Sequence, residues 1–259
     1  MYCKKSEERP IYIKYFNAIQ NWGDLVGPYL VQKISGREVV RVRIGWREHL
    51  LAVGSLLSEA NSKSLVWGAG FISQDSKLKT MPERITMVRG PKTLAKLNEY
   101  GFEEKVPLGD PALLMPRYYF PEIQKTHSVG YVPHYIDRDV NTLKALKDKG
   151  IKVIDIRQDV EPFVDEILSC KAIFSSSLHG LIAADTYGLN SKWVQGSSKI
   201  IGGRFKFDDY YESLSIINEQ ALDQKAIINM SESALVAEAW RKNMDIDHAL
   251  LLSAFPYMS

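Results

Sequence analysis

Short apolar runs alternate with amphipathic stretches along most of this chain, and this alternation constrains its fold more than any other feature. The runs have the length of buried strands, and the stretches between them have the periodicity of helices. Repeated strand–helix units predict an α/β protein with a largely parallel sheet. The strands are expected at residues 11–16, 50–53, 64–67, 85–88, 128–132, 151–156, 172–174 and 192–194.

Turn and capping residues place helices between these strands. The first helix is expected to follow the turn at Asn21–Asp24, to carry Pro28 in its first turns and to end near Gly36. The last is expected from Ser231 to about Met244, with one apolar face for packing. Other helices are expected at 91–100, 143–149 and 160–169, and after residue 177.

A proline-rich segment between Pro107 and Pro121 interrupts the pattern and predicts a domain boundary near residue 122. The expected domains are residues 1–122 and residues 123–259, each Rossmann-like, the second including the C-terminal helix. Two such halves facing a cleft would form a glycosyltransferase-B type of arrangement. Periodicity alone does not separate this arrangement from one continuous doubly wound sheet.

Glycine follows several of the predicted strands, as Gly68 and Gly70 follow the strand at 64–67. Ligands of open α/β sheets bind beyond the carboxyl ends of the strands, and glycine there lets a ligand approach the backbone. These glycines therefore predict a lined cleft.

Composition excludes several classes of protein. The 33 basic and 31 acidic residues nearly cancel, which argues against a nucleic-acid partner. No apolar run approaches the roughly 20 residues that span a bilayer, and the first residues lack the apolar core of a signal peptide. Cys3 and Cys170 cannot form a disulfide framework, and no metal-binding spacing is present, so no metal is expected. These features indicate a soluble, cytoplasmic enzyme or binding protein.

The segment from Phe174 to Gly180 is the strongest candidate site. It consists of a strand end, the turn Ser175-Ser176-Ser177 and a helix that begins at Leu178 and carries His179 in its first turn. A helix start presents unpaired N–H groups and a positive dipole end, which favour an anion. Histidine can move protons near neutral pH. Together they predict an anion site with a proton donor, without naming the reaction.

Seven motifs occur in a fixed order over most of residues 11–195. This series resembles the polysaccharide pyruvyl transferases, and the tail from Lys199 to Tyr211 is similar to the bacterial exopolysaccharide branch of that family. The motifs are Asn21-Trp22-Gly23-Asp24, Val53-Gly54-Ser55-Leu56-Leu57, Trp67-Gly68-Ala69-Gly70, Val88-Arg89-Gly90-Pro91-Lys92-Thr93, Leu108-Gly109-Asp110-Pro111-Ala112-Leu113-Leu114, Val132-Pro133-His134-Tyr135 and Ser176-Ser177-Leu178-His179-Gly180.

The resemblance implies two domains similar to those of glycosyltransferase-B enzymes, with the acceptor on the first and the donor on the second. It implies phosphoenolpyruvate as donor substrate, no cofactor, and a hexose of a glycan or of a lipid-linked precursor as acceptor. The product would be a pyruvate ketal. A lipid-linked acceptor would bring the protein to the cytoplasmic face of the inner membrane.

Ketal formation needs a general acid, cations for the donor, and a base for the sugar hydroxyls. His179 is the expected acid, and Arg89 is the expected partner of the donor's anionic groups. The other expected substrate-binding residues are Ser175, Ser176, Ser177, Leu178, Gly180, His134, Asn21, Asp24, Gly68, Gly70, Arg204 and Lys206.

Each of these residues also has a structural interpretation. His134 fits a turn, Arg89 fits a salt bridge, and Asp24 fits a helix N-cap slightly better than a sugar ligand. Arg204 and Lys206, with Tyr210 and Tyr211, either close over an anion or form a solvated loop.

One position departs from the family pattern, because Ser177 stands where the family often has arginine. Another cation must then replace it, with Arg204, Lys206 and Arg89 as candidates, or donor binding is weaker. Two alternatives stay open. A nucleotide-sugar glycosyltransferase would use Asp208 or Asp209 for the ribose, and a catalytically silent glycan-binding subunit would account for Ser177.

Overall fold

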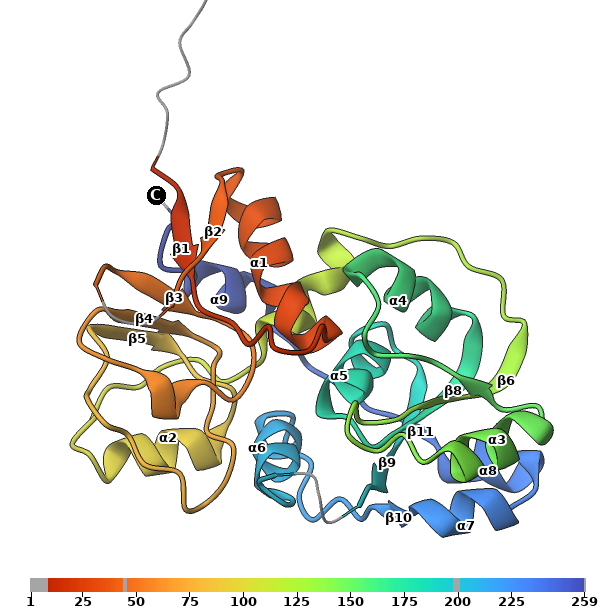
Figure 1. The fold of residues 1–259 in the computed structure, drawn as a ribbon. Coiled ribbons are helices and arrows are strands. Elements are labelled where there is room, and N and C mark those ends of the chain that lie inside the picture. The colour runs from red at the N-terminus through yellow and green to blue at the C-terminus, as the bar shows by residue number, and fades with distance from the viewer. Residues whose placement is uncertain (1–8, 44–45, 198–200, 259) are drawn as a thin grey trace, which may run out of the picture.

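The computed structural model describes residues 9–43, 46–197 and 201–258, and its strands form two sheets, each flanked by helices (Figure 1). The first sheet has the strand order β2-β1-β3-β4-β5, and all of its pairs are parallel. Its strands are β1 (Ile11–Ile13), β2 (Val39–Arg41), β3 (His49–Leu51), β4 (Ser64–Trp67) and β5 (Arg84–Met87).

The second sheet has the order β10-β9-β8-β6-β7, with parallel pairs, and β11 lies antiparallel to β9. The parallel strands confirm the predicted α/β class. The strands of this sheet are β6 (His127–Val132), β7 (Lys152–Val153), β8 (Cys170–Ser175), β9 (Asn190–Gln195), β10 (Leu222–Asp223) and β11 (Trp240–Arg241).

Helices connect and flank the strands (Figure 1). None of those in the described part of the chain is both long and apolar enough to cross a membrane. The α-helices are α1 (Trp22–Ser35), α2 (Pro91–Asn98), α3 (Val140–Asp148), α4 (Val160–Leu168), α5 (Leu178–Thr186), α6 (Phe205–Ser213), α7 (Gln224–Asn229), α8 (Glu232–Glu238) and α9 (His248–Ser253), and the 3-10 helices are η1 (Leu57–Glu59) and η2 (Pro111–Arg117).

The helix expected from Ser231 to Met244 is shorter than predicted. It ends at Glu238, because Ala239 has extended backbone and Trp240–Arg241 pairs with β9. The Lys242 ammonium then donates to the backbone oxygen of Ser191 at 2.6 Å. Strand pairing and this buried hydrogen bond outweigh the helical periodicity of the segment.

The last helix, α9, lies against the first sheet although it follows the second sheet in the sequence (Figure 1). The Trp67 indole donates to the backbone oxygen of Leu251 at 3.0 Å, and its ring packs edge-on against Phe255. The C-terminal segment therefore covers the first half of the chain, not the second half to which the sequence assigned it.

A shared apolar core joins the two halves at α1, α4, α5 and η2. Trp22 is fully buried there, packs on Phe163, and donates its indole hydrogen to the backbone oxygen of Val160 at 3.1 Å. This packing brings the N-terminal ends of α1 and α5 together, and so positions the candidate site.

Candidate active site

Residues from both halves line a cavity of about 390 Å³ beside the N-terminal ends of α1 and α5. It brings together seven of the substrate and catalytic residues predicted from the sequence: Asn21, Asp24, His134, Ser177, Leu178, His179 and Lys206. The other lining residues are Phe16, Gly54, Ser55, Leu56, Glu59, Ile72, Tyr135, Ile136 and Ile201.

The three serines of the turn before α5 have different environments. The Ser175 hydroxyl bonds within the turn, lying 2.8 Å from the backbone oxygen of Ser177 and accepting from the Ser177 N–H at 3.0 Å. Ser176 accepts a hydrogen bond from the His134 N–H at 2.8 Å and faces a different cavity. Ser177 is the N-cap residue of α5, but its side chain does not cap the helix. Ser175 and Ser176 therefore shape the turn, and only Ser177 lines the cavity beside His179.

His179 lies between α1 and η2. Its ring occupies the space beside Gly23, where an added Cβ would come within 1.9 Å of Nδ1. Its Nε2 is buried without a hydrogen-bond partner, 4.0 Å from Oδ2 of Asp110, which has none either. Burial, with nearby Arg89, Lys206 and His134, lowers the pKa of His179 to about 3, so the free protein holds a neutral imidazole at pH 7.

Asp110 caps η2 through its other oxygen, which accepts from the Ala112 N–H at 2.9 Å. Burial raises its pKa to about 6, and the Arg89 charge opposes that rise. Asp110 therefore fixes the turn before η2 with one oxygen and places the other, Oδ2, beside His179.

Lys206 is 91% buried, since only 9% of its surface is exposed. Among the described residues its ammonium has no hydrogen-bond or ion-pair partner, and it lines the same cavity as His179. Burial and the Arg89 charge lower its pKa to about 8. A buried cation without a counter-ion is costly unless an anion binds beside it.

His134 also reaches this cavity, and its ring stacks on Tyr135 with centroids 4.5 Å apart. Its Nδ1 accepts a hydrogen bond from the Ile136 N–H at 3.3 Å. Burial and the Lys206 charge lower its pKa to about 4. His134 therefore serves the turn and lines the cavity, so both interpretations made from the sequence apply.

Asn21, not Asp24, is the N-cap of α1, because its side chain accepts from the Gly23 N–H at 3.0 Å. The Asp24 carboxyl lines the cavity, and its side chain has no hydrogen-bond or ion-pair partner within the described ranges. Burial raises its pKa to about 7. The prediction that Asp24 caps this helix is therefore wrong. The cap is the residue just before the helix, which is Asn21, and Asp24 lies inside the first turn.

Arg89 lies behind the cavity and joins the two halves of the chain. It is fully buried, and its Nε donates to Oδ2 of Asp209 on α6 at 2.9 Å. It also donates to Ser55 Oγ at 2.9 Å and to the Phe71 backbone oxygen at 2.6 Å. Arg89 has these partners and is not among the residues that line the cavity, so the structure does not place it as the direct anion partner expected from the sequence.

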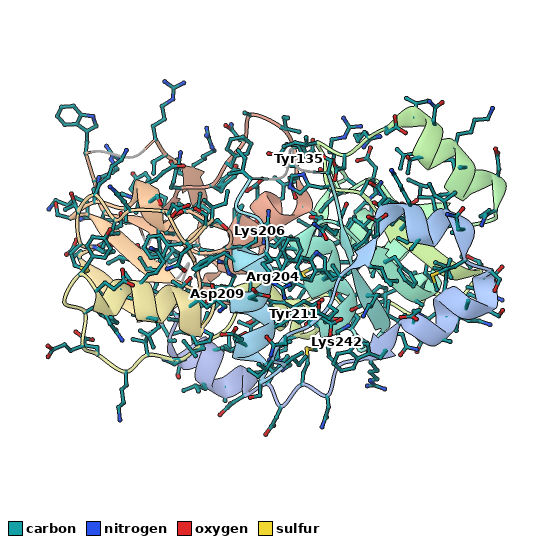
Figure 2. All side chains as sticks on the ribbon, turned by 90° about the horizontal axis from the view of Figure 1, so that it is seen from below. Tyr135, Arg204, Lys206, Asp209, Tyr211 and Lys242 are labelled. Atoms are coloured by element: carbon teal, nitrogen blue, oxygen red, sulfur yellow. The ribbon has the colours of Figure 1, made fainter. Side chains whose placement is uncertain are left out.

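Asp209 also binds the first turn of α2. Its Oδ1 accepts from the Thr93 N–H at 2.8 Å, and its Oδ2 accepts from the Thr93 hydroxyl at 2.7 Å. A Cβ at Gly90 would lie 1.8 Å from the Asp209 backbone oxygen, which explains the glycine in Arg89-Gly90-Pro91. Figure 2 shows Asp209 on the side of α6 toward the first half and Tyr211 toward the second.

The predicted glycines serve packing rather than the cavity. The space beside Gly68 holds Pro111, and the space beside Gly70 holds the Arg89 guanidinium. A Cβ at Gly180 would lie 2.4 Å from Ser175 Oγ. Neighbouring side chains therefore fill the space beside these three glycines. Among the described residues, Gly54 is the glycine that lines the cavity.

Arg204 and Lys206 do not act as one cluster. Arg204 pairs with Asp208 at 2.9 Å, lies over the Trp193 ring and lines a separate cavity of about 480 Å³. Tyr210 and Tyr211 are buried in the core. The tail segment thus divides between two cavities, and its residues Lys199 and Ile200 lie outside the described part of the chain.

The two halves contribute different groups to the cavity. The second half contributes the Lys206 ammonium and the neutral imidazoles of His134 and His179 near the N-terminus of α5, whereas the first half contributes the carboxyl groups of Asp24 and Glu59. An anionic group fits beside Lys206 and the helix N-terminus, and hydroxyl groups fit beside the carboxyl groups. Among the described residues, no group of three or more His, Cys, Asp or Glu side chains is placed to hold a metal ion.

Four cavity residues were not predicted from the sequence to contact a ligand: Phe16, Ser55, Tyr135 and Ile136. For Ser55 and Tyr135 the available signal was their place inside two of the family motifs. Phe16 and Ile136 lie at or shortly after the end of a predicted strand, which by itself does not indicate a ligand contact.

Comparison with known proteins identifies the family to which the chain belongs. The sequence pattern described as polysaccharide pyruvyl transferase matches residues 35–191. The chain is 30% identical over 226 residues to the uncharacterized protein L143 of Acanthamoeba polyphaga mimivirus, covering 83% of this chain and 78% of that protein. It is 28% identical over 177 residues to the succinoglycan biosynthesis protein ExoV of Rhizobium meliloti (strain 1021), covering 64% of this chain and 54% of that protein.

Among solved structures, an uncharacterized protein from Klebsiella pneumoniae subsp. pneumoniae matches with a TM-score of 0.48 and 12% identity, over 84% of this chain and 92% of that one. The family pattern spans more than half of this chain and includes the turn before α5 with His179. The chain belongs to the polysaccharide pyruvyl transferase family.

Proposed function

We propose that this protein transfers the pyruvyl group of phosphoenolpyruvate to a hexose of a cell-surface polysaccharide or of its precursor, forming a pyruvate ketal. The observation that carries the proposal is the buried Lys206, which has no ion-pair partner among the described residues and lines the same cavity as His179 and the N-terminus of α5. Together they form a site for a small anion next to a proton carrier.

Phosphoenolpyruvate carries a phosphate and a carboxylate, which match the cationic side of this cavity. Lys206 would bind one of these groups, and the unpaired N–H groups of α5 would bind the other. Arg89 adds a positive field from behind while bound to Asp209. The second half would thus hold the donor, as in a glycosyltransferase-B arrangement.

Lys206 is the cation that would replace the arginine that the family often has at the position of Ser177. Of the cations proposed as replacements, Arg89 is bound to Asp209 and Arg204 faces another cavity. Lys206 lines the cavity together with Ser177. A lysine from α6 would therefore supply the charge that the family often supplies from the turn.

His179 would protonate the methylene carbon of the donor. The neutral imidazole gains its proton when the trianionic donor binds, because nearby negative charge raises the pKa of a histidine. The Asp110 carboxylate, 4.0 Å from Nε2, would stabilise the imidazolium and leave Nδ1 as the ring nitrogen that acts on the donor.

The two alternative functions have less support. A ribose partner is lacking at the positions named for it, since Asp209 is fully buried against Arg89 and Asp208 is paired with Arg204. A silent subunit would not need an unpaired buried lysine. Because phosphoenolpyruvate is a cytoplasmic metabolite, we place the reaction in the cytoplasm.

Thermal stabilisation by phosphoenolpyruvate, compared with a panel of nucleotide sugars, tests the proposal. A ligand that binds only the folded protein raises Tm with its concentration. We expect a shift with phosphoenolpyruvate that is lost in Lys206→Met and retained in Arg204→Met, which removes a charge from the same turn. A shift with nucleotide sugars alone would overturn the proposal.

A further inference from the structure

The Asp24 carboxylate differs from the other acidic groups around the cavity. It projects from the first turn of α1, where Asn21 already provides the cap, so the helix does not need it there. It has no hydrogen-bond or ion-pair partner among the described residues. Glu59, the other carboxylate of the cavity, is half-exposed and pairs with Lys14 at 3.1 Å.

Asp24 comes from the first half of the chain, whereas Lys206, the cation of this cavity among the described residues, comes from the second half. Tyr135 lies close enough for the Asp24 charge to contribute, after burial, to raising the pKa of its phenol. A carboxylate and a phenol that lie close together can hold neighbouring hydroxyl groups of a sugar. The Lys206 ammonium in the same cavity provides the place for the donor.

The mouth of this cavity is apolar. Phe16 is 41% exposed, Ile136 is 36% exposed and Ile201 is 66% exposed, and all three line it. The C–H faces of a hexose ring pack on such side chains, whereas a sugar carboxylate would meet Asp24 and Glu59 without a free cation on that side. The acceptor side therefore suits an uncharged sugar.

We propose that Asp24 is the general base of the transfer and that, with Tyr135, it forms the acceptor subsite for an uncharged hexoside with a free pair of hydroxyl groups. This inference rests on the function proposed above.

The proton balance of the reaction supports a separate base. His179 gives a proton to the methylene carbon, the first sugar hydroxyl attacks the neighbouring carbon, and its proton passes to Asp24. The carbon–oxygen bond to phosphate then breaks, phosphate leaves with the electron pair, and the second hydroxyl closes the ketal and loses its proton. Asp24 passes the first hydroxyl proton to the departing phosphate, which leaves as hydrogen phosphate, and the proton of the second hydroxyl restores His179.

The environment of Asp24 suits this role. Burial raises its pKa to about 7, so it both accepts and releases a proton near neutral pH. The titratable groups that line the cavity with Asp24 are those of Glu59, His134, Tyr135, His179 and Lys206.

The test measures phosphate release from phosphoenolpyruvate, with mass spectrometry of the ketal. The acceptors are the methyl glycosides of galactose, glucose and mannose, each beside its C6-carboxylated form. The variants are Asp24→Asn and, as the control, Glu104→Gln, which removes an exposed carboxylate of the first half that does not line the cavity. Calorimetry measures the affinity of each protein for phosphoenolpyruvate.

We expect turnover with at least one uncharged glycoside and a rate at least tenfold lower with its carboxylated form. Asp24→Asn should lose about 100-fold or more in turnover, the range of general base catalysis. It should bind phosphoenolpyruvate as tightly as the native protein or more tightly, because a negative charge is removed. Glu104→Gln should stay within about twofold of the native rate, because its side chain is exposed and does not line the cavity.

Three results would overturn this inference alone: full turnover by Asp24→Asn, equal use of charged and uncharged glycosides, or no turnover with any uncharged glycoside by a protein that binds phosphoenolpyruvate. Absence of phosphoenolpyruvate binding by the native protein would instead overturn the proposed function. Melting temperatures of both variants show that they fold.

Discussion

The Nε2 atom of His179 lies 4.0 Å from Oδ2 of Asp110, and both atoms are buried with no hydrogen-bond partner among the residues that the structure describes. Two complementary groups in this position gain a charge-assisted hydrogen bond when the imidazole is protonated. The free protein thus holds an acid–base pair that a bound anion can complete.

Asp110→Asn tests this pair. Asparagine keeps the oxygen that caps η2 but carries no charge for the His179 imidazolium, so we expect turnover to fall at least about tenfold with little change in phosphoenolpyruvate affinity. Steady-state kinetics and calorimetry measure the two effects. Native turnover in the variant would mean that Asp110 only shapes its turn.

Gly23→Ala should displace the His179 ring, because the new Cβ would lie 1.9 Å from Nδ1. We expect turnover to fall about 100-fold or more, the size of a general acid's contribution. Gly27→Ala is the matched control on the same helix, since its Cβ meets Val53 at an ordinary 3.6 Å. That control should keep its activity and gain up to about 1 kcal/mol of stability from the better helix former. Equal activity in the two variants would contradict the assigned role of His179.

Lys206→Met should weaken phosphoenolpyruvate binding about tenfold or more and stabilise the free protein. The pKa of Lys206 falls from 10.5 to about 8 in the folded chain, so the unfolded chain binds more protons between those pH values. The cost to stability is therefore full below about pH 8 and disappears as the pH rises toward 10.5. Removing the cation should raise the free energy of unfolding at pH 7 by up to about 3 kcal/mol. Chemical denaturation at pH 7 and pH 10 measures this difference, and a less stable variant at pH 7 would contradict it.

The loss of the Lys206 proton should also change the affinity for phosphoenolpyruvate. Native affinity for phosphoenolpyruvate should fall as the pH rises above about 8, because Lys206 loses its charge there. Asp24 ionises near pH 7, so the comparison is made between pH 8 and pH 10, where that carboxylate is already charged. Calorimetry should find no such fall in Lys206→Met, and a parallel fall in both proteins would exclude Lys206 as its cause.

Arg89 and Asp209 should be strongly coupled, because each is fully buried and the pair joins β5 to α6. Removing one partner leaves an uncompensated buried charge, so Arg89→Met and Asp209→Asn should each lower the free energy of unfolding by about 3–5 kcal/mol. Urea denaturation of the single and double variants measures the coupling energy. A loss of less than about 1 kcal/mol from either change would show that this ion pair does not hold the halves together.

Local patterns in the chain were enough to predict the alternation of strands and helices. The strand at 64–67 and the start of the helix at Pro91 occur as expected, because burial in a parallel sheet and a helix-starting proline are written in neighbouring residues. The helix expected to reach Met244 stops at Glu238, since β9, about 50 residues earlier, offers its edge to Trp240–Arg241. Such a partner is not visible in local periodicity.

The predicted cluster of Arg204 and Lys206 is a second case that local sequence patterns could not decide. The two residues are close in the sequence, but positions two apart on a helix point to different sides. Only the docking of α6 between the halves determines that Lys206 reaches His179 while Arg204 reaches Trp193. Arg89 is a similar case, because its partner Asp209 lies 120 positions away.

The sequence by itself therefore determined the α/β class, the family and the residue types available for the chemistry, because these depend on local composition and on ordered motifs. The tertiary structure decided which charges stay unpaired. Within the described part of the chain, Lys206 and Asp24 line the cavity without an ion-pair partner, whereas Arg89 and Arg204 each have a carboxylate partner. Whether a charge is neutralised depends on which segments pack beside it, and in the case of Arg89 that segment is remote along the chain.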